Sequence, residues 1–354
     1  MTTALPLETR KQAAFEHARS GQFAEAASLL QSVLKETPRD VGALLLLGDV
    51  QHAAGQTQNA SRAYTAALQA IQLAGRQVPE AFRSGVQRAQ ARLGEYASGY
   101  EAFIESEMPT AGRTKRFDQS VDILLGKSPI YLQQPTRYYF PGLPQIQFYD
   151  TAGFDWVPGL EAKTADIQQE LHGVLADHQA FRPYLERVDS QPNVNSHALV
   201  GNDDWSAFYL WKDGHRVEEN CARCPVTAAA FENIPLDHLP DQAPSVLFSL
   251  LKPGAHIPPH HGLINTRLVC HLPVLVPGPA WLRVGSETHR WQEGKVCIFD
   301  DSIEHEAKNE ASETRVVLLF DIWRPELSMR EREEIAKFLG AISTYSGEKI
   351  VSGN

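Results

Sequence analysis

The pattern of apolar and polar positions changes character along this chain. Apolar residues recur at helical spacing from residue 10 to residue 71, which is the pattern of amphipathic helices. Residues 106–150 lack a helical period and are rich in proline and aromatic residues, whereas residues 161–181 return to a helical pattern. From about residue 205, short apolar segments alternate with Gly, Pro or Asn clusters, as is typical of strands joined by turns. The pattern therefore predicts a helical N-terminal part and a β-rich C-terminal part.

A repeat of 34 residues organises the helical part. The segment GQFAEAASLLQSVLKETP at 21–38 aligns with GQTQNASRAYTAALQAIQ at 55–72, and a looser copy occupies 92–105. This period and its small residues resemble the tetratricopeptide repeat, a helix–turn–helix unit. The resemblance implies three stacked hairpins with a concave groove, a candidate surface for a peptide or another partner. A generic helical bundle is the alternative.

The β-rich part contains many short strand candidates. PSVLFSLLKPGAHI, TRLVCHLPVLVP and TRVVLLFDIW are apolar-rich and bounded by turn signals. Many short strands at this spacing predict an antiparallel barrel or jelly roll, in which two packed sheets protect the strand edges. The segment ELSMREREEIAKFLGAI that follows has an amphipathic helical pattern, with Ser328 as its expected N-cap.

Composition and charge narrow the class of protein. At 354 residues, with 43% hydrophobic and 21% charged residues, the chain fits a globular protein of two domains. Its net charge of −10 argues against a nucleic-acid partner. No apolar run approaches the roughly 18 residues that a membrane span needs, and the first residues lack a secretory signal layout. We therefore expect a cytoplasmic protein that does not enter a membrane.

The four cysteines include one C-x-x-C pair, Cys221 and Cys224. This spacing is compatible with a zinc site, a disulfide or two structural thiols. No second C-x-x-C pair exists, and a reducing compartment favours thiols. We expect thiols, with a local disulfide and a metal site as the alternatives.

Histidines concentrate in one part of the β-rich region, since six of the thirteen lie between residues 256 and 305. His260 precedes a loop, His305 lies 45 residues later, and Arg315 follows ten residues on. This layout is similar to that of double-stranded β-helix iron oxygenases. Imidazoles suit Fe(II), and open coordination positions admit a chelating co-substrate and O2. An arginine matches the far carboxylate of 2-oxoglutarate.

The carboxylate ligand usual in such sites is missing, because Gly262 stands two residues after His260. The stretches FSLLKPGAHIPPHHG, NTRLVCHLPV, WQEGKVCIFDDSIEHE, ETRVVLLFDIWRPEL and DWSAFYLWKDG together resemble the aspartyl/asparaginyl β-hydroxylases over roughly residues 195–330. In that family, glycine replaces the carboxylate ligand and tetratricopeptide repeats commonly precede the oxygenase domain.

The resemblance implies an α+β chain of two domains. We expect helical repeats over residues 1–125 and an ordered connector over 126–150. A double-stranded β-helix, which is a cupin-like jelly roll, is expected over 151–354.

The resemblance also implies the metal ligands. His260 and His305 match the residues that hold the iron. Asp301 matches an acid beside the second ligand that is placed to hold a water where the third ligand is missing. His261 is not expected to bind the metal, because adjacent strand residues point to opposite faces. His256 and His289 are not expected to take part, and Asp300 is expected to be a hydrogen-bonded structural acid.

Four further residues match positions that bind the co-substrate. Arg315 and Ser249 match the residues that hold the distal carboxylate of 2-oxoglutarate, and His271 matches a residue near the other carboxylate. Arg267 lies in the family's R-L-x-x-H stretch. Where this chain has Val269, some members carry a second arginine.

The implied reaction is hydroxylation of the β-carbon of Asp or Asn residues in a peptide or protein. The enzyme would use Fe(II), 2-oxoglutarate and O2 and release succinate and CO2. By analogy, the loop RVEENCARCP is expected near the mouth of the site, and the repeat groove is a candidate guide for the peptide. Three alternatives are a non-catalytic repeat scaffold with a cupin-like domain, a 2-oxoglutarate-dependent halogenase, and a small-molecule or acyl hydroxylase.

Overall fold

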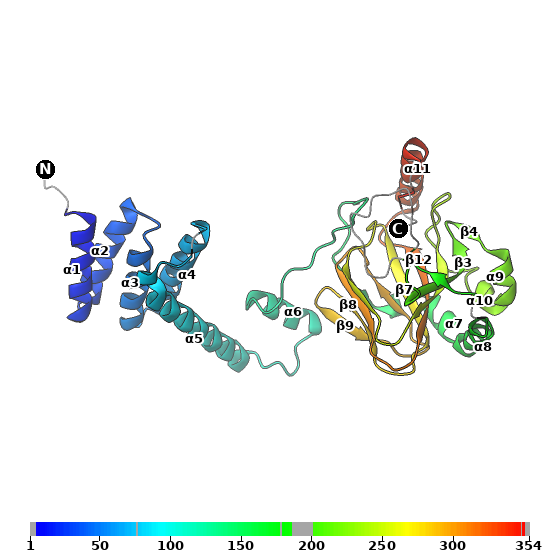
Figure 1. Cartoon of the computed structure of the whole chain (residues 1–354), viewed down its shortest axis with the longest axis horizontal. Helices are drawn as coiled ribbons and strands as arrows, with labels where there is room; N and C mark the ends of the chain where they lie inside the picture. The colour runs from blue at the N-terminus through cyan, green and yellow to red at the C-terminus, as the bar shows by residue number, and fades with distance from the viewer. Residues whose placement is uncertain (1–4, 76, 178, 186–200, 348, 351–354) are drawn as a thin grey trace. The chain divides into compact units, whose positions relative to one another are not determined.

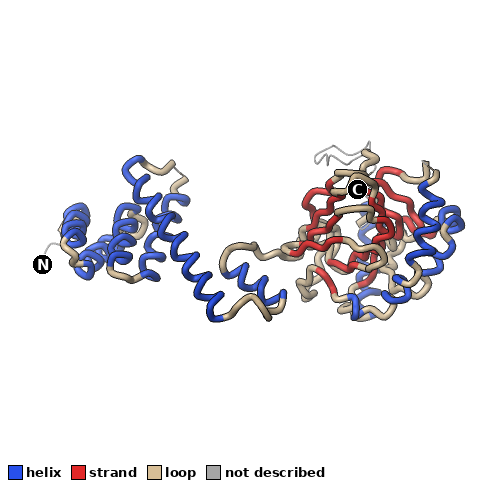
Figure 2. Tube along the Cα trace, turned by 90° about the horizontal axis from the view of Figure 1, so that it is seen from below, coloured by secondary structure: helices blue, strands red, loops and turns tan. Residues whose placement is uncertain are grey.

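The computed structural model of the chain describes residues 5–75, 77–177, 179–185, 201–347 and 349–350. Its residues cluster into two compact units, Met1–Ser128 and Pro129–Asn354. Within the described residues, the first unit contains helices and no strand, and the second contains all the strands (Figures 1 and 2).

The first unit begins with two helical hairpins, each closed by a glycine turn. Gly21 and Gly55 occupy the repeated position and have φ angles of 75° and 74°, which glycine adopts at little cost. Leu30 and Tyr64, at equivalent positions of the two repeats, are both buried. The α-helices of this unit are α1 (Leu7–Arg19), α2 (Phe23–Glu36), α3 (Val41–Ala53), α4 (Thr57–Leu73), α5 (Arg83–Glu107) and α6 (Lys115–Leu124), with a 3-10 turn at Glu80–Phe82.

The predicted third hairpin is wrong. Residues 92–105 lie inside the single helix α5. Gly94 is the counterpart of Gly21 and Gly55, but it lies within this helix and lacks their positive φ. Without a turn at that glycine, the third copy continues as one long helix.

The second unit contains two antiparallel sheets. The larger has the strand order β1-β10-β7-β12-β5-β3-β2, with β4 paired to β3, and the smaller has the order β6-β11-β8-β9. The strands are β1 (Phe148–Tyr149), β2 (Arg182–Pro183), β3 (Trp205–Lys212), β4 (His215–Arg216), β5 (Val246–Leu251), β6 (His256–His260), β7 (Arg267–Leu275), β8 (Ala280–Val284), β9 (Glu287–Arg290), β10 (Cys297–Phe299), β11 (His305–Asn309) and β12 (Arg315–Trp323).

The strands from β5 to β12 pass back and forth between the two sheets. β5, β7, β10 and β12 lie side by side in the larger sheet, and β6, β8, β9 and β11 make up the smaller one. This alternation makes the fold a double-stranded β-helix, as the sequence predicted.

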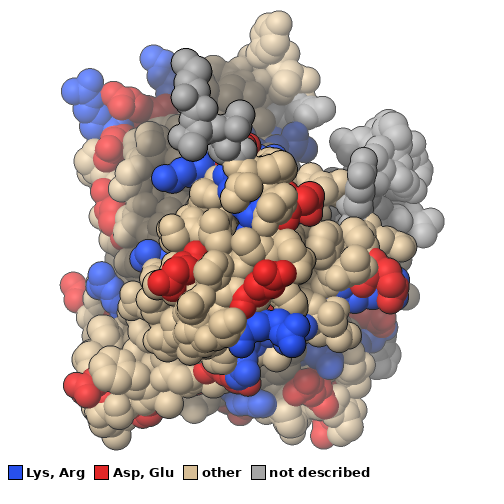
Figure 3. Space-filling model, turned by 90° about the vertical axis from the view of Figure 1, so that its left-hand side faces the viewer, with Lys and Arg blue, Asp and Glu red and all other residues tan. Residues whose placement is uncertain are grey.

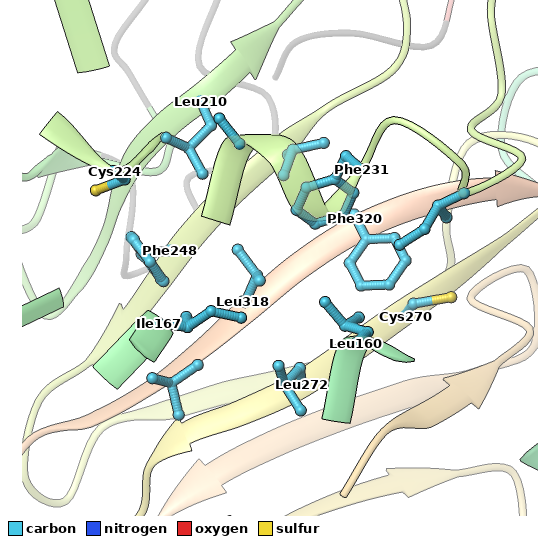
Figure 4. Close-up of a cluster of buried hydrophobic side chains, with 14 of the residues drawn as sticks. Leu160, Ile167, Leu210, Cys224, Phe231, Phe248, Cys270, Leu272, Leu318 and Phe320 are labelled. Atoms are coloured by element: carbon cyan, nitrogen blue, oxygen red, sulfur yellow. The ribbon is translucent and has the colours of Figure 1, made fainter. Parts of the chain in front are cut away.

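The larger sheet buries a different set of side chains on each face. Because side chains alternate along a strand, Val316 and Leu318 of β12 face a core covered by helices, whereas Val317 faces the smaller sheet. Figure 4 shows the helix-side core, in which Phe248, Leu318 and Phe320 pack with Leu160, Ile167 and Phe231. The covering helices are α7 (Val157–Glu161), α8 (Thr164–Leu175), α9 (Glu218–Arg223) and α10 (Pro225–Ala230), and a 3-10 turn lies at Thr151–Gly153.

Helix α11 (Met329–Ser346) begins with the predicted cap. The Ser328 hydroxyl accepts from the Glu331 amide, and the Glu331 carboxylate accepts from the Ser328 amide, which completes a capping box. Among the described residues, no helix is both long and apolar enough to cross a lipid bilayer. On the face shown in Figure 3, basic side chains lie among acidic ones.

Helices α3 and α4 of the first unit pack closely at Gly48. A Cβ added at Gly48 would overlap the ring of Tyr64, whose hydroxyl donates to Asp49 at 2.8 Å. We predict that Gly48→Ala lowers the free energy of unfolding of this unit by about 1–3 kcal/mol, because overpacking displaces the helices. Urea unfolding followed by far-UV circular dichroism measures the loss. Tryptophan fluorescence should stay unchanged, since all six tryptophans lie in the second unit.

Gly94→Ala is the matched control. No atom lies within 4 Å of the Cβ that it would add. Alanine at an exposed helical position should stabilise the unit by about 0.5–1 kcal/mol. Equal midpoints for the two variants would contradict the tight α3–α4 contact.

Candidate active site

A cavity of about 480 Å³ lies in the second unit, with side chains from both sheets in its wall. Clefts of this size that combine apolar walls with a few polar groups are typical of small-molecule sites. The structure brings together in this cavity all the residues that the sequence proposed for the site: Ser249, His260, Arg267, His271, Asp301, His305 and Arg315.

His260 and His305 face each other across neighbouring strands. They are register partners in the antiparallel pair β6–β11, and their ring centroids are 4.1 Å apart. The Nδ1–H of His260 donates to the Pro258 carbonyl at 2.8 Å, and the Nδ1–H of His305 donates to the Ile303 carbonyl at 3.1 Å. Since a carbonyl only accepts, both rings carry their lone pair on Nε2 when neutral.

Burial keeps the second histidine neutral. Desolvation, followed by the nearby His260, holds the pKa of His305 well below its usual value. A neutral imidazole with a fixed tautomer is the form that binds a metal ion.

The space beside Gly262 is filled by a carboxylate from another part of the chain. The Gly262 amide donates to the Asp301 carbonyl at 2.7 Å, and a Cβ at Gly262 would overlap the Asp301 carboxylate. A side chain at position 262 is therefore excluded. The Asp301 Oδ1 is buried and, among the described residues, lacks a hydrogen-bond partner.

Arg267 lies between two buried carboxylates. Its guanidinium is 3.4 Å from Asp301 Oδ2 and 3.0 Å from Asp321 Oδ2. Burial raises the pKa of Asp301 and raises that of Asp321 to about 6, although Arg267 opposes both shifts. Asp237, also buried, has a pKa raised well above its usual value by burial and then by Asp321.

Arg315 is a buried cation that forms no ion pair with a carboxylate of the described residues. Its side chain is 1% exposed, its Nη1 donates to the Ser249 carbonyl at 3.3 Å, and its guanidinium lies 4.1 Å from the ring centre of Trp291. Desolvation lowers its pKa to about 9. A buried cation without a counter-ion is costly, so this end of the cavity is built to receive an anion.

Two other polar side chains lie near Arg315. The Trp205 Nε1–H donates to the Ser249 hydroxyl at 3.1 Å, which orients that hydroxyl. Burial, followed by the charge of Arg315, holds the pKa of His271 well below its usual value. Its Nδ1 lacks a hydrogen-bond partner among the described residues.

Comparison with known proteins identifies both units. The tetratricopeptide repeat family model matches residues 17–93, and the family model described as aspartyl/asparaginyl beta-hydroxylase matches residues 161–325. The chain carries an aspartyl/asparaginyl β-hydroxylase domain preceded by tetratricopeptide repeats.

Relatives of this hydroxylase-family domain have differing names. The Rhizobium tropici ornithine lipid ester-linked acyl 2-hydroxylase is 37% identical over 192 residues, which are 53% of this chain and 64% of the relative. The human aspartyl/asparaginyl beta-hydroxylase is 39% identical over 37% of this chain and 17% of its own length. The Xenopus tropicalis aspartate beta-hydroxylase domain-containing protein 2 is 31% identical over 58% of this chain and 54% of its own length. This chain thus spans less than two thirds of each of these relatives.

Three further histidines of this region, His256, His261 and His289, were not expected to bind the metal. His261 lines the cavity, His256 lies 2.7 Å from Glu306, and His289 packs on Phe148. Within the residues described, no group of three His, Cys, Asp or Glu side chains is arranged to hold a metal.

The stretch RVEENCARCP was expected as a loop at the mouth, and this expectation is wrong. Most of it forms α9 and the start of α10, and it contributes nothing to the cavity wall. Cys221 and Cys224 are free thiols buried in the helix-side core. Their spacing of three residues places both on the buried side of the segment.

Sequence reasoning missed Trp205, Trp291 and Asp321. Asp321 had a visible signal, because it is an acid inside the apolar run VVLLFDIW. A buried acid requires a partner, and Arg267 is that partner. Neither tryptophan is distinguished in the sequence from an ordinary core residue.

Asp300 is the predicted hydrogen-bonded structural acid. It pairs with Arg324 at 2.6 Å, both side chains having no exposed area, and it accepts from Gln133 at 2.6 Å and from the Ser302 hydroxyl at 2.6 Å. These contacts fix the turn that presents Asp301.

Removing the cation of this pair should be costly. We predict that Arg324→Met destabilises the second unit by about 3–5 kcal/mol, because it leaves the Asp300 carboxylate buried without its counter-ion. Urea unfolding followed by tryptophan fluorescence measures the change. Arg330→Met is the control, since Arg330 pairs with Glu334 on the surface, where their side chains are 86% and 62% exposed. A surface pair contributes little, and equal losses in both variants would contradict the role of the buried pair.

Proposed function

We propose that the chain is an Fe(II)- and 2-oxoglutarate-dependent hydroxylase. The observation that carries this proposal is the combination, in one cavity, of two tautomer-fixed histidines and a buried arginine that has no carboxylate partner among the described residues. The histidines fit a metal ion, and the arginine fits an anionic co-substrate. The hydroxylase-family domain supports the same reaction class.

His260 and His305 would hold the iron through Nε2. Imidazole is a common ligand of Fe(II), and two protein ligands leave positions open for exogenous molecules. Asp301 occupies the space next to Gly262, and its partnerless Oδ1 is able to accept a hydrogen bond from a water at the third-ligand position. Bound iron would supply the activation of O2 that hydroxylates an unactivated C–H bond while 2-oxoglutarate becomes succinate and CO2.

The residues around Arg315 would bind and orient the co-substrate. The Arg315 guanidinium is placed to pair with the distal carboxylate, and the Ser249 hydroxyl, fixed by Trp205, donates to it. Neutral His271 faces the same space and can donate a hydrogen bond to the other carboxylate without adding charge. Arg267 holds Asp301 in place, so we assign it a positioning role. The apolar side chains of Val269, Leu282 and Leu319 in the wall would reduce the contact of the reacting C–H with water.

For the substrate, we propose the β-carbon of an Asp or Asn residue in a peptide or protein, in keeping with the family of the domain. The tetratricopeptide repeats are a candidate surface for guiding the peptide. The cytoplasmic location stays a prediction.

Acyl hydroxylation is a second candidate. The Rhizobium tropici relative is named as an acyl 2-hydroxylase, and Val269, Leu282 and Leu319 line the cavity of this chain. A hydrocarbon chain would be compatible with these walls.

Arg315→Met tests the co-substrate assignment. Adding Fe(II) and then 2-oxoglutarate to the anaerobic wild-type protein should produce a visible metal-to-ligand charge-transfer band. The variant should need at least about 30-fold more 2-oxoglutarate for the same band, because a buried charge pair is lost. Arg290→Met, on exposed Arg290 of β9, is the control and should match the wild type. A folded wild-type protein without the band would contradict the proposed function.

A further inference from the structure

The ionised side chains in the inner part of the cavity already balance one another. Arg267 lies within ion-pair distance of Asp301 and Asp321, and Arg315 is the other buried cation in the wall. Among the described residues, the inner wall therefore carries two guanidinium groups and two carboxyl groups.

Both arginines are paired with carboxylates if the proposed function is correct. Arg267 pairs with Asp301 and Asp321, and Arg315 would pair with the distal carboxylate of 2-oxoglutarate. The charges of Fe(II) and of doubly ionised 2-oxoglutarate cancel each other. The described inner wall therefore offers no further cation to a substrate that brings a negative group.

The wall next to Arg267 is apolar where a second anion would need a partner. Arg267, Val269 and His271 lie on the same face of β7 and line the cavity. Val269 is the register partner of Asp321, and His271 is that of Leu319. A substrate carboxylate that enters here would contact Val269, Leu319 and Asp321, none of which can neutralise it. Two buried carboxylates, Asp301 and Asp321, already lie here beside Arg267, so a further buried negative charge would be repelled by them and would lose its hydration.

The more exposed charged groups of the cavity wall do not change this balance. Lys349 pairs with Asp213 at 2.7 Å, and their side chains are 45% and 30% exposed. Lys212 lies over the ring of Tyr209. At these exposed positions, solvent and salt screen the charges, so they act on the parts of a substrate that remain outside.

We propose that the reacting group admitted by this cavity is uncharged, and that in a peptide substrate it is the side chain of asparagine and not that of aspartate. The proposal rests on the proposed function and narrows its substrate class. Asp321 and Val269 are the specificity-determining residues. Asp321 neutralises the charge of Arg267, and the uncharged side chain of Val269 cannot form an ion pair with an anionic substrate.

Two peptide pools test the preference. They share randomised flanking positions and differ only in a central Asn or Asp, and they are incubated with the full chain, Fe(II), 2-oxoglutarate and O2. Mass spectrometry measures the gain of one oxygen. The asparagine pool should gain at least tenfold more. An equal or larger gain in the aspartate pool overturns the proposal.

The charge-transfer band distinguishes failure of the asparagine assignment from failure of the proposed Fe(II)- and 2-oxoglutarate-dependent function. If the band is absent, the proposed function fails and the substrate assignment falls with it. If the band is present and neither pool gains oxygen, the asparagine assignment alone is overturned. A fatty-acyl methyl ester in detergent micelles is run beside the pools. Oxygen gained by that ester alone overturns the asparagine assignment in favour of an acyl chain.

Val269→Arg tests the charge argument. It places a cation between Arg267 and His271 and should shift the ratio of asparagine to aspartate hydroxylation at least tenfold toward aspartate. Val269→Met lengthens the side chain without a charge and should leave the ratio unchanged. Asp321→Asn, which frees Arg267 with little change in shape, should shift the ratio in the same direction if Val269→Arg does not fold. An unchanged ratio in a charge variant that shows the band overturns the proposal.

Discussion

The pairing of β6 with β11 is the constraint on which the rest of the site depends. Its register makes His260 and His305 direct partners, although 45 residues separate them in the chain. The carbonyls of Pro258 and Ile303 then fix both rings in the same tautomer. A shift of one residue would turn one imidazole to the other face of the sheet, so metal binding and strand register are linked.

The carboxylate of the site comes from the turn before the second histidine. Gly262 leaves the room that Asp301 occupies, and Arg267 holds the Asp301 carboxylate from the other side. The same turn is fixed beneath by the buried pair of Asp300 and Arg324. The backbone N–H of Gln134 also donates to the Ser302 backbone carbonyl at 2.7 Å. The segment that precedes β1 therefore helps to shape the site as well as linking two parts of the chain.

Local signals made part of this structure predictable. Glycines at positions 21 and 55 marked the first two hairpins, because those turns need a positive φ, and the spacing of short apolar segments indicated the strands. The prediction of a third hairpin failed because Gly94, the equivalent glycine, has a helical conformation. The amino-acid sequence of a single chain does not distinguish a turn glycine from a helical one.

The contacts within the site were less accessible from the sequence. The resemblance indicated which residues would line the cavity, but not that Arg267 lies between two carboxylates or that Trp291 covers Arg315. These contacts join β7, β12, the segment between β9 and β10, and the turn between β10 and β11. They follow from strand register and side-chain packing. The stretch RVEENCARCP was misplaced because an analogy was used where the helical spacing of two buried cysteines was the better guide.

A crystal structure of the full chain grown anaerobically with Fe(II) and 2-oxoglutarate tests the central claim most directly. Anomalous scattering at the iron edge would locate the metal independently of the side chains. The account predicts one ion within bonding distance of Nε2 of both His260 and His305, with Asp301 outside bonding distance and 2-oxoglutarate reaching Arg315. Iron bound directly by Asp301, or iron bound away from this histidine pair, would contradict the account.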